Sequence, residues 1–289
     1  MRVGLFIPTF NAGDGFIEVV ELINEQSEML YRKLIIDSGS IDNTVNIALD
    51  NNFEVKEIPL SEFGHGKTRT LAAKELSDCQ YVIYMSHDVF LQKDAIKNII
   101  HFITTNSNIG IVYGKQDVDM KKSNIFEKRA REFNYPDESS IKSYANKKQY
   151  GIKTVFSSDA FAIYDQEKLK KIGYFPKNIN FAEDIFVAAK MIQEGYNVGY
   201  CAEAKVFHSH NYSALDEYKR YKEIGKFHRE NSWIQDEFGK NEKEGIKAVT
   251  SELRILIKSG KYHLLPNSMS RFLLKYLGYR KGNSSKLIE

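Results

Sequence analysis

A carboxylate at the end of an apolar stretch is the clearest candidate for chemistry in this chain of 289 residues. Residues 81–89 form a largely apolar stretch typical of a β-strand, and Ser86, His87 and Asp88 lie at its carboxyl end. Ligands of open α/β sheets bind outside the carboxyl ends of the strands. A buried carboxylate is costly unless a partner offsets its charge. We therefore expect Asp88 to hold a divalent metal that carries a nucleotide diphosphate, with a cap on the helix near residue 93 as an equal alternative.

Two polar loops follow the first two predicted strands, and they should lie at the same edge of the sheet. Their candidate substrate-binding residues are Pro8, Thr9, Asn11, Asp37, Ser38 and Ser40. An aspartate there can accept a hydrogen bond from a pyrimidine N3–H, and small residues let base and ribose approach. No Gly-x-Gly-x-x-Gly follows the first strand, which counts against a dinucleotide fold. Ordinary turns are the alternative, because Asp, Ser and Gly dominate turns.

Residues 63–69 read Phe-Gly-His-Gly-Lys-Thr-Arg at an expected helix start. Free backbone N–H groups, the positive end of a helix dipole and two cations, Lys67 and Arg69, suit a diphosphate, and His65 lies among them. Ser61 stands where a Walker A loop has its first glycine, so this is not such a loop. A basic helix start exposed to water is the alternative.

Two further pairs complete the candidates. Glu183 and Asp184 open a predicted helix, where Asp184 can serve as a general base or simply as a structural cap. His208 and His210 follow the last predicted strand, and one imidazole can complete a metal shell begun by Asp88.

Strands and helices must alternate to position these residues. Predicted strands cover residues 3–7, 34–36, 53–58, 81–89, 109–114, 156–164 and 198–207, with helices at 15–29, from 42, at 67–76, 94–103, 123–133 and from 183. This alternation predicts an α/β fold whose mostly parallel sheet is covered on both faces. From residue 213 the periodicity is helical only, so we expect a domain at 1–212 and a helical extension at 213–289. The stretch 115–150 is expected to hold a helix and a mobile loop over the site.

Composition narrows the setting. A formal net charge of +3 is too small to indicate nucleic-acid binding. Cys79 and Cys201 lie in or beside apolar runs and are interpreted as buried thiols in a reducing compartment. The N-terminal apolar run is too short for a signal peptide, and no run is long enough to span a membrane. We expect a cytoplasmic protein, free or peripherally attached to the inner face of the cell membrane.

The order of these motifs resembles a known family. Ile7–Asn11, Asp37–Ser40, Ser86–Asp88 and Glu183–Asp184 are similar to the motifs of inverting glycosyltransferases of family 2, which have the GT-A fold. The resemblance narrows to bacterial rhamnosyltransferases through residues 63–69, 206–212, 219–221, 225–228 and 274–280, so it covers nearly the whole chain. One departure is that Ser86-His87-Asp88 replaces the usual Asp-x-Asp, which leaves one carboxylate for the metal.

The resemblance implies a dTDP-L-rhamnose donor and a sugar acceptor on a lipid-linked surface polysaccharide, as in capsule or cell-wall synthesis. It implies a single displacement in which Asp184 deprotonates the acceptor and Mg²⁺ or Mn²⁺ on Asp88 stabilises the leaving diphosphate. Lys67 and Arg69 would add positive charge, while His87 and Glu183 would contact substrate. Alternatives are another donor such as a UDP-hexose, a nucleotidyltransferase, and a non-catalytic module that binds sugar nucleotides or glycans.

The C-terminal helix near 267–280 carries an apolar face with Arg271, Lys275, Arg280 and Lys281 at its border. This pattern suits an anionic lipid surface. We expect the helix to contact a membrane or a partner subunit in a homo-oligomer, or else to pack on its own domain.

Overall fold

The computed structural model describes residues 1–120 and 123–284, and the chain divides into two compact units. The first comprises Met1–Asp117, Pro136–Asn146 and Thr154–His208, and the second comprises Val118–Tyr135, Lys147–Lys153 and Ser209–Glu289. The last segment of the first unit ends at His208 and the last segment of the second begins at Ser209, whereas the sequence predicted a domain boundary after residue 212. Two earlier stretches, 118–135 and 147–153, group with the C-terminal helices instead.

The first unit is built on one mixed sheet whose strands run in the order β3-β2-β1-β4-β8-β6-β9-β5, with β7 paired to β9. The strands are β1 Val3–Thr9, β2 Arg32–Asp37, β3 Glu54–Glu57, β4 Tyr81–Met85, β5 Phe90–Leu91, β6 Ile109–Asp117, β7 Ser140–Lys142, β8 Phe161–Asp165 and β9 Asn197–Phe207. Sequence periodicity missed β5 and β7, which are too short to show a pattern. The predicted strand at 156–164 begins only at Phe161, because residues 156–160 form a loop.

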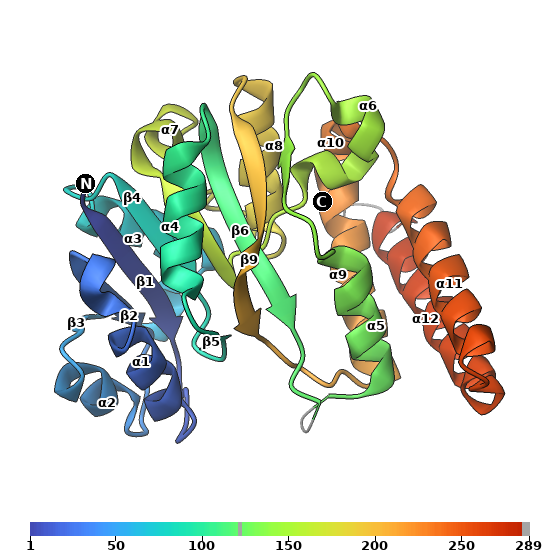
Figure 1. The fold of residues 1–289 in the computed structure, drawn as a ribbon, viewed down its shortest axis with the longest axis horizontal. Coiled ribbons are helices and arrows are strands. Elements are labelled where there is room, and N and C mark those ends of the chain that lie inside the picture. Colours follow the sequence, from blue (N-terminus) through green and yellow to red (C-terminus); the bar gives the residue numbers. More distant parts are fainter. Residues whose placement is uncertain (121–122, 285–289) are drawn as a thin grey trace. The chain divides into compact units, whose positions relative to one another are not determined.

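The helices of this unit are α1 Phe16–Asn24, α2 Thr44–Asp50, α3 His65–Glu75, α4 Ala95–Thr105, α7 Gln166–Lys171 and α8 Glu183–Gln193, with short 3-10 turns η1 Ser27–Met29 and η2 Leu60–Glu62. One apolar core joins α1, α2 and α4 to one face of the sheet. Figure 1 shows α4 crossing the near face, with α8 behind the sheet. Cys79 and Cys201 are buried free thiols, as predicted.

Strand direction decides which loops meet. β1, β2, β3, β4, β6 and the main run of β9 are parallel where paired, while β8 runs antiparallel between β4 and β6. The start of β8 therefore lies at the same edge as the ends of β4, β6 and β9. The loop before β8 joins the loops after β1, β2, β4 and β9 at this carboxyl edge.

Alternate residues of the central strands also build a second, aromatic face. Tyr84 of β4 contacts Phe6, Tyr164 and Phe175, with ring centroids 5.0–5.6 Å apart. These rings bury a large apolar area but leave each tyrosine hydroxyl in need of a polar partner. Both hydroxyls find one at the carboxyl edge, as described below.

The second unit is helical. Its elements are α5 Ile125–Asn134, α6 Lys147–Tyr150, α9 Ala214–Glu230, α10 Ser232–Phe238, α11 Asn241–Lys258 and α12 Leu265–Ser284, with 3-10 turns η3 Gly151–Val155, which ends in the first unit, and η4 Tyr262–Leu264. The helices predicted at 123–133 and after 213 are confirmed. Across the described residues, none of the helices combines the length and apolar character needed to cross a membrane.

Close backbone contact between α9 and α12 explains three glycines. A Cβ added at Gly225, Gly278 or Gly282 would lie 2.2, 2.4 or 1.9 Å from a carbonyl oxygen of the other helix. α12 therefore packs on α9 through the side that carries Gly278 and Gly282. The apolar side chains that form the predicted amphipathic stripe of α12 lie on its other side and are exposed. Arg271 and Lys275 turn inward and both pair with Glu217 of α9.

Candidate active site

Asp37, at the end of β2, is fully buried and organises the loop that follows it. Its Oδ1 accepts hydrogen bonds from the backbone N–H groups of Gly39 and Ser40, at 3.0 and 2.7 Å. Its Oδ2 accepts from the hydroxyls of Thr9 and Ser40, at 2.7 and 2.6 Å. A carboxylate has about four lone-pair sites, and these four bonds use them. Asp37 shapes the loop in this arrangement, and its direct contact with a pyrimidine stays a prediction.

Further bonds join the loops after β1 and β2. The Asn11 amide oxygen accepts from the backbone N–H of Ile41, and the Asn11 N–H donates to Ser40 Oγ. Asn11 has φ +46°, a left-handed conformation that asparagine tolerates better than most residues. Ser38 is buried and donates to the Thr9 carbonyl. The predicted nucleotide-binding residues Thr9, Asn11, Asp37, Ser38 and Ser40 are therefore joined in one hydrogen-bonded network at the ends of β1 and β2.

Within residues 63–69, which were expected to cradle a phosphate, Gly66 has a packing role. A Cβ at Gly66 would lie 1.9 Å from the carbonyl oxygen of Pro176, so only glycine lets α3 approach this loop. Thr70 Oγ1 donates to the Phe175 carbonyl at 3.2 Å, one turn further along. The start of α3 is thus docked on the segment that leads to α8. His65 and Lys67 are exposed at the first turn of α3.

Arg69 is buried rather than exposed. Its Nε lies 2.8 Å from Asp159 Oδ2, and its Nη1 lies 2.8 Å from Glu183 Oε1. Burial alone would lower the pKa of Arg69, but these two carboxylates outweigh it and raise the pKa further above its usual value. Arg69 thus neutralises acidic neighbours in the protein, and its contact with a leaving diphosphate stays a prediction.

Asp184 lies beside this ion-paired cluster without an ion pair of its own among the described residues. Its Oδ1 accepts from the Ile185 N–H at 2.8 Å, and its Oδ2 faces the Asp159 N–H at 3.4 Å. Burial, followed by the charges of Asp159 and Glu183, raises the pKa of Asp184 to about 8. A carboxyl group with a pKa near the working pH is suited to take a proton from a hydroxyl. The residue is half-buried, so it is open on one side.

Three residues of this cluster carried no distinct signal in the sequence. Asp159 lies in a predicted strand, and burial, partly offset by Arg69, raises its pKa to about 6. The Tyr164 hydroxyl hydrogen-bonds Asp159 Oδ1, and the Tyr84 hydroxyl donates to the Arg69 carbonyl at 3.5 Å. These tyrosines look like ordinary core residues in the sequence. The antiparallel pairing of β4 with β8 brings them together beside the site.

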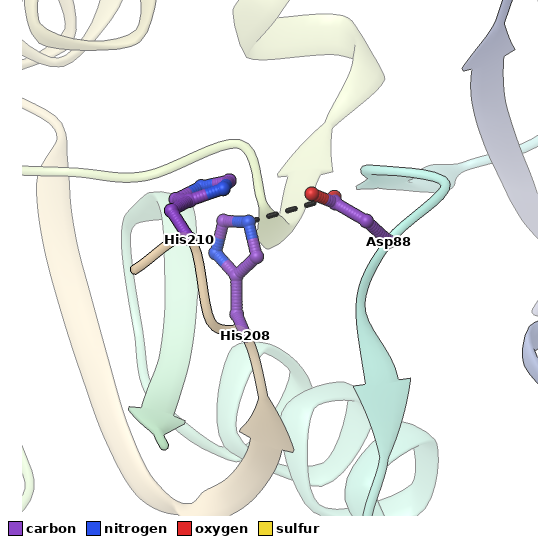
Figure 2. Close-up of side chains that lie close together, drawn as sticks. All are labelled: Asp88, His208 and His210. Atoms are coloured by element: carbon purple, nitrogen blue, oxygen red, sulfur yellow. Dashed lines mark ion pairs between the residues drawn. The ribbon is translucent and has the colours of Figure 1, made fainter. Parts of the chain in front are cut away.

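A second acidic position combines with histidine. His208 Nε2 lies 3.5 Å from Asp88 Oδ1, and the candidate ligand atoms of Asp88, His208 and His210 all lie within 4.8 Å of one another. Figure 2 shows the Asp88 carboxylate and the His208 ring turned toward each other. Asp88 follows β4 in a turn and is half-buried, as is His87. The structure thus brings together the three residues predicted to hold a metal.

The donor set fits a divalent ion. Gln116 Nε2 donates to Ser158 Oγ at 2.8 Å, which leaves its Oε1 to accept from His208 Nδ1 at 2.9 Å. This bond places the proton on Nδ1 and directs the Nε2 lone pair toward Asp88, an orientation typical of metal-binding histidines. A mixed set of imidazole nitrogens and one carboxylate oxygen suits a divalent transition-metal ion better than Mg²⁺, which prefers oxygen ligands.

Comparisons with known proteins identify the family of the chain. The family model described as glycosyl transferase family 2 matches residues 5–173. The O-antigen chain rhamnosyltransferase RfbN of Salmonella typhimurium is 40% identical over 284 residues, which cover 98% of this chain and 90% of that protein. The O-antigen chain rhamnosyltransferase WbaN of Salmonella anatum is 39% identical over 280 residues, which cover 96% and 88%.

Among solved structures, the mannosyltransferase PcManGT from Pyrobaculum calidifontis, in complex with GDP-Man and Mn²⁺, superposes with a TM-score of 0.64 at 13% identity, covering 96% of this chain and 86% of that one. The predicted GT-A fold, with its mostly parallel sheet and C-terminal helices, is confirmed. The chain belongs to glycosyl transferase family 2 and is a glycosyltransferase.

Proposed function

We propose that this glycosyltransferase moves L-rhamnose from dTDP-L-rhamnose to a sugar hydroxyl of a lipid-linked O-antigen intermediate, with inversion at the anomeric carbon. The observation that carries this proposal is identity of 40% over 98% of the chain to a protein named for rhamnosyl transfer to O-antigen chains. The half-buried Asp184, with its raised pKa, supplies the chemistry that such a transfer needs.

The proposed reaction is a single displacement. Asp184 accepts the proton of the acceptor hydroxyl as that oxygen bonds to the anomeric carbon, and the bond from the anomeric carbon to the nucleoside diphosphate breaks. Asp88, His208 and His210 would hold a divalent ion, which when bound supplies positive charge for the leaving diphosphate. Lys67, exposed at the start of α3, adds a mobile cation of the protein itself. The loops after β1 and β2 hold the nucleoside.

A donor panel tests the proposal. Purified protein would be incubated with a lipid extract of bacterial membranes and dTDP-L-rhamnose, UDP-glucose or GDP-mannose, each with Mn²⁺. We expect release of free dTDP and transfer of labelled rhamnose to the lipid fraction. NMR of the product should show that the anomeric configuration has been inverted. Faster turnover of a UDP-hexose would assign another donor. Binding without turnover of any donor would favour the non-catalytic module instead.

We also propose that the exposed side of α12 contacts an anionic lipid surface, where a lipid-linked acceptor would be found. Met269, Leu273, Tyr276 and Leu277 are 47–61% exposed and lie at helical spacing on one side of α12. Arg280 is exposed one turn further along the same side, so the apolar stripe has a basic end. An apolar stripe with a cation beside it is typical of helices that lie in a membrane interface.

A further inference from the structure

We propose that Arg69 is a positioning residue that clamps Asp159 and Glu183, so that the surplus proton of this acidic cluster is held on Asp184. This proposal rests on glycosyl transfer with Asp184 as the base. It assigns the conspicuous arginine of residues 63–69 to the acceptor side of the reaction instead of the diphosphate.

The clamp joins three separate elements. Arg69 lies on α3, Asp159 in the loop before β8, and Glu183 in the first turn of α8. The side chains of all three are at most 9% exposed, and both ion-pair distances are 2.8 Å. Charge-assisted contacts of this kind are strong in a buried setting, and breaking one partner leaves the other charged and unpaired. The pairs therefore fix where α8 begins, and Asp184 is the next residue after Glu183.

Backbone contacts reinforce the clamp. Gly66 touches the Pro176 carbonyl, and Thr70 bonds to the Phe175 carbonyl, so α3 is docked on the loop that leads into α8. Both contacts flank Arg69 along the same helix. Gly66, Arg69 and Thr70 thus act together as a support for the start of α8.

Charge balance then decides where a proton resides. Three carboxylates share one guanidinium, and two of them are directly paired with it. The other groups that face the cluster do not add a fixed charge: Tyr164 from β8 and Tyr84 from β4 point their hydroxyls at it, and His65 of α3 has Nδ1 3.3 Å from Arg69 Nη1. Among the described residues, Asp184 is the one of these three carboxyl groups that makes no direct ion pair with Arg69, so it is the one that retains a proton near neutrality.

This arrangement has a functional consequence. The basic form of Asp184 is populated as the pH rises through its pKa of about 8, and once formed it is a stronger base than an ordinary aspartate. Removing a neighbouring negative charge should lower that pKa. Removing Arg69 should release α8 from its fixed position.

The first test measures the pH midpoint of Asp184 in wild type, Asp159→Asn and the control Lys74→Gln, which removes an exposed charge from α3, the helix that carries Arg69. Turnover against pH and ¹³C-carboxyl NMR of aspartate-labelled protein, assigned with Asp184→Asn, give two readings. We expect Asp159→Asn to shift the midpoint down by at least about one pH unit, and Lys74→Gln to leave it in place. An unshifted midpoint in Asp159→Asn overturns the proposal. The NMR reading needs no substrate, so a wrong donor assignment would not affect it.

The second test separates positioning from diphosphate binding. We expect Arg69→Gln to lower kcat at least about tenfold while the calorimetric Kd for dTDP stays within about threefold of wild type, because Arg69 is paired with Asp159 and Glu183 inside the protein. Weaker dTDP binding by about tenfold or more, with the Asp184 midpoint unchanged in Asp159→Asn, would return Arg69 to the leaving group. Circular dichroism identifies an unfolded variant, in which case the Asp159→Asn result decides.

Discussion

Asp37 and Asp184 are aspartates at the same edge of one sheet, and the protein treats them in opposite ways. Asp37 is fully buried and accepts four hydrogen bonds from amides and hydroxyls of its own loop. Asp184 is half-buried, accepts bonds only from backbone groups among the described residues, and shares its surroundings with two more carboxylates. The first charge is spread over neutral dipoles, whereas the second adds to a cluster that already holds excess negative charge.

The difference shows what distinguishes a structural acid from a reactive one. A carboxylate whose lone pairs are all used by groups of its own loop holds that loop in place. A carboxyl group with an open side and negative neighbours keeps basicity in reserve.

Removal of divalent ions tests whether Asp88 takes part in the reaction by holding a metal ion. We expect EDTA, or the change Asp88→Ala, to lower turnover by about a hundredfold, since a bound cation contributes several kcal/mol to stabilising the leaving group. Added Mn²⁺ should restore the wild type and not the variant. Full turnover in EDTA would mean that the protein's own cations suffice, and Asp88 would then be a structural acid like Asp37.

Gly66→Ala tests the support behind Asp184. The new Cβ would lie 1.9 Å from the Pro176 carbonyl oxygen, so α3 must move away, at a cost of about 2–3 kcal/mol in the free energy of unfolding. Gly64→Ala is the matched control, because its Cβ would lie 3.5 Å from the nearest atom, on the flexible Lys67 side chain. Urea denaturation measures both. Equal stability of the two variants would contradict the docking of α3 on this loop.

Asp37→Asn makes the same substitution at Asp37 that would remove the base at Asp184. Its amide can keep the two backbone N–H donors on the oxygen and turn its NH₂ toward the hydroxyls of Thr9 and Ser40, which can rotate to accept. We expect a loss of about 1 kcal/mol in stability and dTDP affinity within about threefold of wild type. A tenfold or greater loss of dTDP affinity, with the fold intact, would show that Asp37 contacts the base directly.

Leu273→Glu on α12 should have the smallest effect on the folded protein. Leu273 is 57% exposed, so the free energy of unfolding should change by less than about 0.5 kcal/mol. Flotation with anionic vesicles at low salt should nevertheless fall clearly, with Ser270→Glu, an exposed polar site on the same helix, as control. No flotation of the wild type itself would remove the lipid contact.

Local patterns revealed the main strands, the alternation with helices, and the loops that carry Asp37, Asp88 and Asp184. They failed where a partner distant in sequence decides the role. Arg69 reads as an exposed cation at a helix start until β8 and α8 bring Asp159 and Glu183 against it. The need for glycine at Gly225, Gly278 and Gly282 likewise becomes visible only in the structure, where α9 and α12 are in backbone contact. The apolar stripe of α12 was found, but its inward-facing Arg271 and Lys275 depend on Glu217, which periodicity cannot show.

The most direct measurement compares single-turnover transfer by the wild type and by Asp184→Asn, with the calorimetric Kd for dTDP determined on the same samples. Asparagine keeps the shape of the side chain and removes its basicity. We expect transfer to fall at least about a hundredfold while dTDP affinity stays within about twofold. Near-normal transfer by Asp184→Asn would contradict its role as the base and direct attention to Glu183 or Asp159.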